Sequence, residues 1–201
     1  MSEPRIPPLP RDEWSPELTT FIADFQATVR SDRRRTPGPN GANLLGTLAG
    51  YPALTKAFLT FNGHFLYGTS LSARQRELLI LRVARVRHCD YEWAQHVFQG
   101  QVAGLEPEEI TRVADGPDAP GWTSIDRALI KAADEFLADG TVGDETWKVL
   151  AGEFDERQLM DVVFTMGTYE MLAKAMLCLG IQLDDDLIPF LPEQPANGAT
   201  P

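Results

Sequence analysis

Four side chains near the middle of the chain can move protons or attack an electrophile: Glu77, Cys89, Glu92 and His96. On a helix, Glu92 and His96 lie one turn apart, and Cys89 returns to nearly the angle of His96. A thiol, an imidazole and two carboxylates at this spacing suit two kinds of chemistry. One is attack by a thiolate, and the other is general acid–base catalysis.

The trio Cys89, Glu92 and His96 has two interpretations, because the main apolar stripe of its helix lies on the opposite side. On a solvated edge, the Glu92–His96 pair would be a helix-stabilising contact of ~0.3 kcal/mol. In a cleft facing Glu77, Glu92 would orient His96. The helix N-terminus and the imidazole would then lower the pKa of Cys89.

Two aromatic residues, Tyr91 and Trp93, belong to the same helix, with Tyr91 on its apolar side. Trp93 shares the side of Cys89 and His96, which favours an edge that is covered rather than washed by solvent. We predict Tyr91 and Trp93 to be substrate-binding residues.

Glu77 also has two interpretations. On its helix it shares a side with three apolar residues: Ile80, Leu81 and Ala84. Burial there without a charged partner would raise the pKa of this carboxyl group, as a group exchanging protons near neutrality requires. Alternatively, Glu77 sits at the margin and pairs with Arg74 or with a neighbouring helix. The arginines of this helix predict a solvated edge: Arg74, Arg82 and Arg85.

Helical periodicity and helix-start residues organise the rest of the chain, and no segment alternates as a strand does. We predict an all-α helical bundle, with a rhythm shared by RELLILRVARV and RQLMDVVFTMG that hints at internal duplication. The expected helices lie near residues 15–30, 52–67, 72–87, 90–104, from 107 onward, 123–138, 144–152 and 155–179. Residues 1–187 form one domain with an extended N-terminal arm, and residues 188–201 a disordered tail.

Composition narrows the functional classes. The formal charge of −11 gives no attraction to nucleic acids or anionic membranes, and no unbroken apolar run approaches the ~18 residues of a membrane span. The N-terminus lacks the apolar stretch of a signal peptide, so we expect a cytoplasmic protein. The basic stretch at residues 30–35 predicts a solvated connector, with an anion-attracting arm as the alternative.

The two cysteines, Cys89 and Cys178, are too few for a disulfide scaffold or a thiolate zinc site. Cys178 lies in an apolar run, which predicts a buried and inert thiol. We expect no metal and no cofactor. A metal held by Glu92, His96 and either His64 or His88 is the weaker alternative.

Several blocks in order resemble the carboxymuconolactone decarboxylase family, whose fold is similar to that of alkylhydroperoxidase D. They are RIPPLPRDEW, AGYPALTKAF, Glu77 with its apolar neighbours, the run CDYEWAQH and DERQLMDVVFTMGTYEMLAKAM. In the peroxidase branch a glutamate is followed by Cys-x-x-Cys-x-x-x-His. The resemblance places Glu77, Cys89 and His96 at matching positions, with Glu92 where the second, peroxide-attacking cysteine would be. A dithiol cycle needs two neighbouring thiols, so this departure argues against it.

The decarboxylase branch acts on a small carboxylated lactone without metal or organic cofactor. The resemblance therefore implies a cofactor-independent lyase, decarboxylase or isomerase acting on a small organic acid or lactone. In that scheme His96 is the general acid or base, Glu92 orients it, and Glu77 is a second proton-transfer group. Two alternatives remain, a thiol peroxidase using Cys89 alone and a non-catalytic binding subunit. The resemblance also implies a homo-oligomer, as a dimer, trimer or hexamer.

Overall fold

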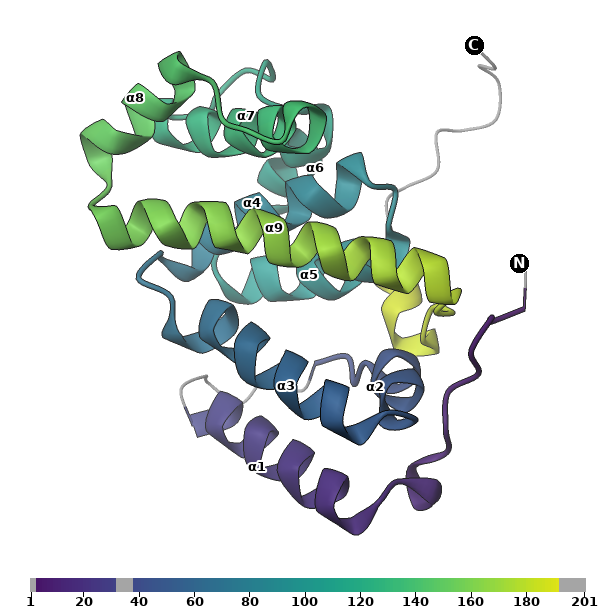
Figure 1. Cartoon of the computed structure of the whole chain (residues 1–201). Coiled ribbons are helices and arrows are strands. Elements are labelled where there is room, and N and C mark those ends of the chain that lie inside the picture. Colours follow the sequence, from purple (N-terminus) through teal and green to yellow (C-terminus); the bar gives the residue numbers. More distant parts are fainter. Residues whose placement is uncertain (1–2, 32–37, 192–201) are drawn as a thin grey trace, which may run out of the picture.

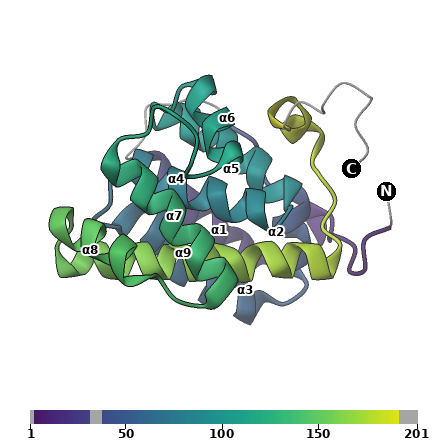
Figure 2. The same ribbon diagram turned by 90° about the horizontal axis from the view of Figure 1, so that it is seen from above.

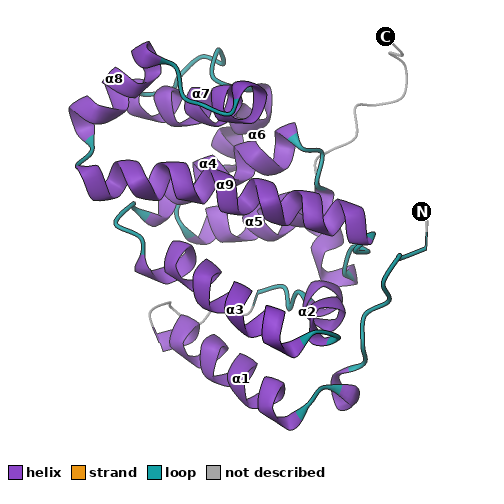
Figure 3. Cartoon of the chain, viewed as in Figure 1, coloured by secondary structure: helices purple, strands orange, loops and turns teal. Residues whose placement is uncertain are grey.

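The computed structural model describes residues 3–31 and 38–191, and this part of the chain contains helices but no strand (Figures 1 and 3). The all-α prediction is therefore confirmed for the described residues. Two of the predictions concern residues that the structure does not describe, in part or in full. Most of the basic stretch at residues 30–35 and of the predicted tail at residues 188–201 lies outside the described residues. Residues 188–190 of that tail are helical rather than disordered.

The described helices follow the predicted order. They are α1 (Pro16–Ser31), α2 (Ala42–Ala49), α3 (Pro52–Gly63), α4 (Ala73–Val86), α5 (Asp90–Val102), α6 (Pro107–Asp115), α7 (Ser124–Asp139), α8 (Asp144–Glu153) and α9 (Glu156–Leu179). Two short 3-10 helices, η1 (Arg11–Glu13) and η3 (Asp185–Phe190), lie near the ends. A π-helical turn, η2 (His64–Gly68), follows α3 directly.

Four of these elements, η1, α2, η2 and η3, were not predicted. The α2 helix has only eight residues, with Gly46 inside it and Gly41 as its N-cap, so its sequence carries weak helix signals. The turn η2 falls inside a segment that we expected to be one regular helix. The helix η3 ends at Phe190, whose ring meets that of Phe98 edge to face at 5.7 Å between centroids.

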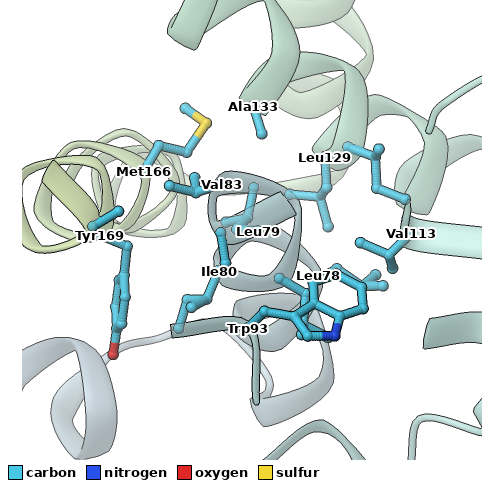
Figure 4. Packing of buried hydrophobic residues seen from close by; sticks show 14 of the residues in the cluster. Leu78, Leu79, Ile80, Val83, Trp93, Val113, Leu129, Ala133, Met166 and Tyr169 are labelled. Atoms are coloured by element: carbon cyan, nitrogen blue, oxygen red, sulfur yellow. The ribbon is translucent and has the colours of Figure 1, made fainter. Parts of the chain in front are cut away.

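The helix α4 lies at the centre of the molecule, packed against α5, α7 and α9. Its residues Leu78, Leu79, Ile80 and Leu81 are completely buried, so apolar side chains leave it in every direction (Figure 4). Such a helix must be enclosed on all sides. A smaller apolar cluster around Leu18 joins α1, α2 and α3 beneath this central layer (Figures 1 and 2).

The arginines of α4 hold neighbouring helices rather than forming a solvated edge. Arg74 pairs with Asp126 at 2.8 Å, and Arg82 Nε pairs with Asp134 at 2.6 Å. Both side chains are partly buried, and only Arg85 is exposed. The predicted solvated edge is therefore wrong for Arg74 and Arg82, because acidic residues on α7 face these two arginines.

The long helix α9 crosses the whole molecule beside α4 (Figures 1 and 2). Among the described residues it is the one helix long and apolar enough to cross a membrane by length and composition alone. In this structure one side of it is buried against α4, α7 and α8. Its outer side leaves Met171 and Leu177 half exposed. Cys178 lies on that outer side and is exposed, so the predicted buried position for this thiol is wrong.

The extended N-terminal arm fastens two distant parts of the fold. Arg5 N donates to Leu179 O at 3.0 Å, and Leu9 N donates to Gly46 O at 3.0 Å. A Cβ at Gly46 would lie only 2.9 Å from Leu9 O, so the arm and α2 touch backbone to backbone there. The arm thereby links the C-terminal end of α9 to α2.

Candidate functional site

The turn between α4 and α5 sets the positions of the four candidate residues. Ser72 and Gln75 form a reciprocal capping box that fixes the start of α4. At the other end, His88 adopts a left-handed φ of 53°, the only positive φ at a non-glycine residue in the described segments. Cys89 then caps α5. This sharp reversal lays α5 against α4, so that His96 faces back toward Glu77.

Glu77 and His96 form a buried pair. The Nδ1 atom of His96 lies 2.7 Å from Oε2 of Glu77. The other carboxylate oxygen, Oε1, accepts from Nε and Nη2 of Arg76 at 3.0 and 2.8 Å. Arg76 in turn donates to Leu66 O at 2.9 Å. The predicted approach of His96 to Glu77 is confirmed. The solvated edge is wrong, because Cys89, Glu92 and His96 are all buried.

Glu77 is ionised, contrary to the expectation of a raised pKa. Burial alone would raise its pKa, but the charges and hydrogen bonds of His96 and Arg76 outweigh that effect, and the pKa lies below its usual value. The sequence pattern identified the apolar surroundings correctly. It did not indicate that Arg76, the residue directly before Glu77, would donate hydrogen bonds to the same carboxylate.

Glu92 is also fully buried, but neither of its carboxyl oxygens has a hydrogen-bond partner in the described part of the chain. Burial raises its pKa well above the usual value, which favours the protonated, neutral form of the carboxyl group. The predicted role of Glu92 in orienting His96 is therefore wrong, and Glu77 orients that ring instead. The two glutamates have exchanged the roles that their spacing suggested.

Cys89 is not a reactive thiolate. Its side chain is 2% exposed. Burial raises its pKa to about 12, against the effect expected from a helix N-terminus. The thiol therefore stays protonated at neutral pH.

A third helix contributes groups that the sequence interpretation missed. The ring of Tyr169 on α9 meets His96 edge to face, with 4.9 Å between centroids. The hydroxyls of Tyr169, Thr165 and Thr168 are all buried without a hydrogen-bond partner among the described residues. Burial and the charge of Glu77 raise the pKa of Tyr169 well above its usual value. The sequence could have indicated these groups, because Thr165, Thr168 and Tyr169 recur at helical spacing within the otherwise apolar helix α9.

The two predicted substrate-binding aromatics have structural contacts. Trp93 lies among the core residues around Leu78 (Figure 4). Tyr91 donates its hydroxyl hydrogen to Asp184 at 2.6 Å, which ties α5 to the segment before η3. Their assignment to substrate binding stays a prediction.

The described cavity of about 550 Å³ lies elsewhere, between η2 and the first turns of α9. None of Glu77, Cys89, Glu92 and His96 lines it. Within the described segments no cluster of three or more His, Cys, Asp or Glu side chains is arranged to hold a metal ion.

Residues 52–135, which carry the Glu77–His96 pair, match the carboxymuconolactone decarboxylase family. This segment belongs to that family. It runs from α3 into α7 and includes all four candidate residues. No curated protein sequence matches the chain.

Solved structures share the fold over nearly the whole chain. An uncharacterized peroxidase-related protein from Ralstonia eutropha JMP134, an alkylhydroperoxidase AhpD core, superposes with a TM-score of 0.72 and 18% identity, covering 92% of this chain and 96% of that one. A peroxidase-related protein from Silicibacter sp. TM1040 gives 0.69 and 16%, covering 93% and 97%. The debrominase Bmp8 in complex with 2,3,4-tribromopyrrole gives 0.74 and 12%, covering 92% and 94%. At these identities the likeness establishes the alkylhydroperoxidase-D-like fold.

Proposed function

We propose that the protein is a cofactor-independent lyase or isomerase that moves protons on a small organic acid or lactone. The observation that carries this proposal is the buried His96–Glu77 pair, with the neutral acid Glu92 one helical turn away on α5. An ionised carboxylate on Nδ1 fixes the ring orientation and leaves Nε2 to exchange a proton with substrate. A neutral carboxylic acid can donate a hydrogen bond to developing negative charge.

In a decarboxylation, the bond between the substrate and its carboxylate carbon breaks, carbon dioxide leaves and the electron pair passes into the neighbouring carbonyl. The resulting enolate oxygen accepts a hydrogen bond from Glu92. Protonated His96 then delivers its proton to carbon, and Glu77 stabilises the imidazolium before that transfer. In an isomerisation, His96 removes a proton from one carbon and returns it to another. Neither reaction changes the oxidation state of the protein.

The thiol chemistry of the alternative proposal is disfavoured by the state of Cys89. A pKa of about 12 leaves almost no thiolate at neutral pH, and Glu92 occupies the position of a second thiol. The structurally similar debrominase binds a small halogenated pyrrole. That complex supports a fold of this kind accommodating a small organic molecule.

The test uses the carboxylated muconolactone that gives the family its name, with carbon dioxide release as the readout. We expect wild-type turnover and a loss of about 10²-fold or more in His96→Gln, the size typical for removing a general acid or base. Glu92→Gln should retain part of the activity, because its amide can still donate a hydrogen bond.

The matched control is His88→Asn, since His88 is exposed and asparagine tolerates its left-handed backbone. Its turnover should equal that of the wild type. Equal turnover in His96→Gln would refute the assignment. Peroxide consumption that disappears in Cys89→Ser would favour the peroxidase, and a wild-type protein without turnover would favour the non-catalytic subunit.

A further inference from the structure

The cavity between η2 and α9 has a size and composition typical of a small-molecule site. Its volume of about 550 Å³ falls within the roughly 300–1,000 Å³ of such pockets. The residues that line it come from the end of α3, from η2 with the loop after it, and from the first three turns of α9. We call it the η2–α9 groove.

One wall of the groove is aromatic. The rings of Phe65 and Phe164 are nearly parallel, 6.5 Å apart between centroids, and Phe61 meets Phe65 edge to face at 5.0 Å. Phe61 and Phe164 are 46% and 54% exposed, although phenylalanine side chains are normally covered. A flat ring placed against this wall would cover apolar surface and gain ring–ring contacts.

A histidine whose orientation is fixed stands beside this wall, since the ring of His64 meets that of Phe65 edge to face at 5.0 Å between centroids. Nε2 of His64 lies 2.8 Å from Oδ1 of Asp161, whose Oδ2 accepts from N and Oγ of Ser70 at 2.6 and 2.7 Å. Burial opposes ionisation of Asp161, but the hydrogen bonds from Ser70 and His64 outweigh it, and the pKa lies below its usual value.

The second ring nitrogen of His64 is the one left for a ligand. Nδ1 lies over Gly68, where an added Cβ would come within 3.1 Å of it. Because Gly68 has no side chain, this side of the imidazole stays open to the groove. Nδ1 accepts a hydrogen bond in the neutral ring and donates one when the ring carries both protons.

A permanent positive charge completes the groove. Arg157 lines it from the first turn of α9, is exposed, and forms no salt bridge with any described residue. Among the residues that line the groove, Arg157 is the one with a permanent positive charge. Its planar guanidinium matches a carboxylate in geometry and charge.

We propose that the η2–α9 groove binds a small aromatic carboxylate, with the ring against the phenylalanine wall and the carboxylate accepting hydrogen bonds from Arg157 and from Nδ1 of the doubly protonated His64 ring. This ligand site involves none of the four residues of the Glu77–His96 centre. Ligand binding at this site is measured without turnover. The binding test can therefore fail or succeed whatever the outcome for the proposed reaction.

The experiment is a titration of the full chain with benzoate, followed by calorimetry and by NMR chemical shifts of the backbone amides. We expect a dissociation constant on the order of 1 mM, as suits a ligand of this size, and shifts confined to η2, the loop after it and the start of α9. Benzyl alcohol, which lacks the charge, and acetate, which lacks the ring, should each bind at least about tenfold more weakly.

Two surface variants test the two halves of the groove. Phe164→Ala and Arg157→Gln should each weaken benzoate binding about tenfold, and neither side chain is needed for folding because both are exposed. Tyr51→Ala removes an equally exposed aromatic ring outside the groove and should leave binding unchanged. The proposal is overturned if benzoate does not bind, if acetate binds as tightly, or if both groove variants bind like the wild type.

Discussion

Two glutamates on facing helices are equally buried and yet differ in charge. Glu77 is paired with Arg76 and His96, so its carboxylate is stabilised. Glu92 has no hydrogen-bond partner among the described residues, so its neutral form is favoured. Neighbours therefore decide the charge of each group, and burial alone does not.

Glu92→Gln tests the neutral state through the pH dependence of stability. A pKa raised in the folded state contributes stability that is complete below the unfolded pKa of about 4.3 and is lost as pH rises toward the folded pKa. Over that window the wild type should lose up to about 1.4 kcal/mol per pH unit relative to the variant. Urea unfolding of both proteins at several pH values above 5 measures the difference, which should grow with pH. A constant difference would contradict the assignment.

Glu77→Gln is the matched substitution and should behave oppositely. It leaves the buried Arg76 without its anionic partner, which we expect to cost about 3 kcal/mol of unfolding free energy at pH 7. The pKa of Glu77 is lowered in the folded state, so its stabilisation is present above the unfolded pKa and disappears as pH falls through the folded value. The variant and the wild type should therefore converge in acid. A variant as stable as the wild type at pH 7 would refute the ionised pair.

The two cysteines should react at very different rates. Cys178 is exposed, whereas Cys89 is buried with a pKa of about 12. Iodoacetamide at pH 7.5 should label the folded protein at Cys178 and leave Cys89 unmodified, as read by peptide mass spectrometry. Cys178→Ser should abolish labelling until the protein is unfolded. Rapid labelling of Cys89 in the folded state would revive the thiol mechanism.

At the scale of elements, α9 carries a polar stripe on its buried side. Asp161 faces the η2–α9 groove, Tyr169 faces His96, and the unpartnered hydroxyls of Thr165 and Thr168 lie on the helix between them. An unpaired buried hydroxyl loses its interaction with water without compensation.

Thr165→Val keeps the shape of the side chain and removes the unpaired group. We expect the unfolding free energy to rise by about 1 kcal/mol, since the desolvation penalty of the hydroxyl disappears. Chemical denaturation of the variant checks this. Thr19→Val is the control, because that hydroxyl donates to Ser15 O at the surface, and it should have little effect. A comparable loss of stability in Thr165→Val would instead indicate a bound solvent molecule.

The helix boundaries were largely predictable because their signals are local. Capping residues such as Ser72 and Asp155 act within three residues, and the structure confirms both as N-caps. The charge state of Glu77 and the orientation of His96 depend on a contact between two helices. The periodicity of one segment cannot predict which residues of another helix it will contact. The contribution of Tyr169, more than seventy residues away along the chain, is likewise a property of the packed fold.

At the scale of the whole molecule, an exposed apolar strip on α9 predicts association between copies. Met160, Phe164 and Met171 are 55%, 54% and 50% exposed, and their spacing along α9 places them on one side of this helix. Monomeric proteins rarely leave such residues grouped on one face. Homo-oligomer formation, expected from the family resemblance, stays a prediction.

Met171→Lys should shift the protein toward the monomer, because a charge at the strip cannot be buried between copies without a large penalty. Sedimentation velocity of the wild type and the variant over a range of concentrations measures this. Lys131→Met, on the exposed face of α7, changes the charge elsewhere and should leave the association state unchanged. A wild type that sediments as a monomer at every concentration would contradict the prediction.

The π-helical turn η2 gives the η2–α9 groove an evolutionary consequence. A π-turn contains about one residue more than an α-turn, so losing a single codon within residues 64–68 would restore regular helical spacing. Residues on one side of the deletion would then rotate by about 100° relative to the other, separating His64 from the ring wall or from Asp161. One insertion or deletion is therefore enough to create or abolish the groove while α4 and α5 keep their contact. Homologous chains should differ in this feature as a discrete presence or absence.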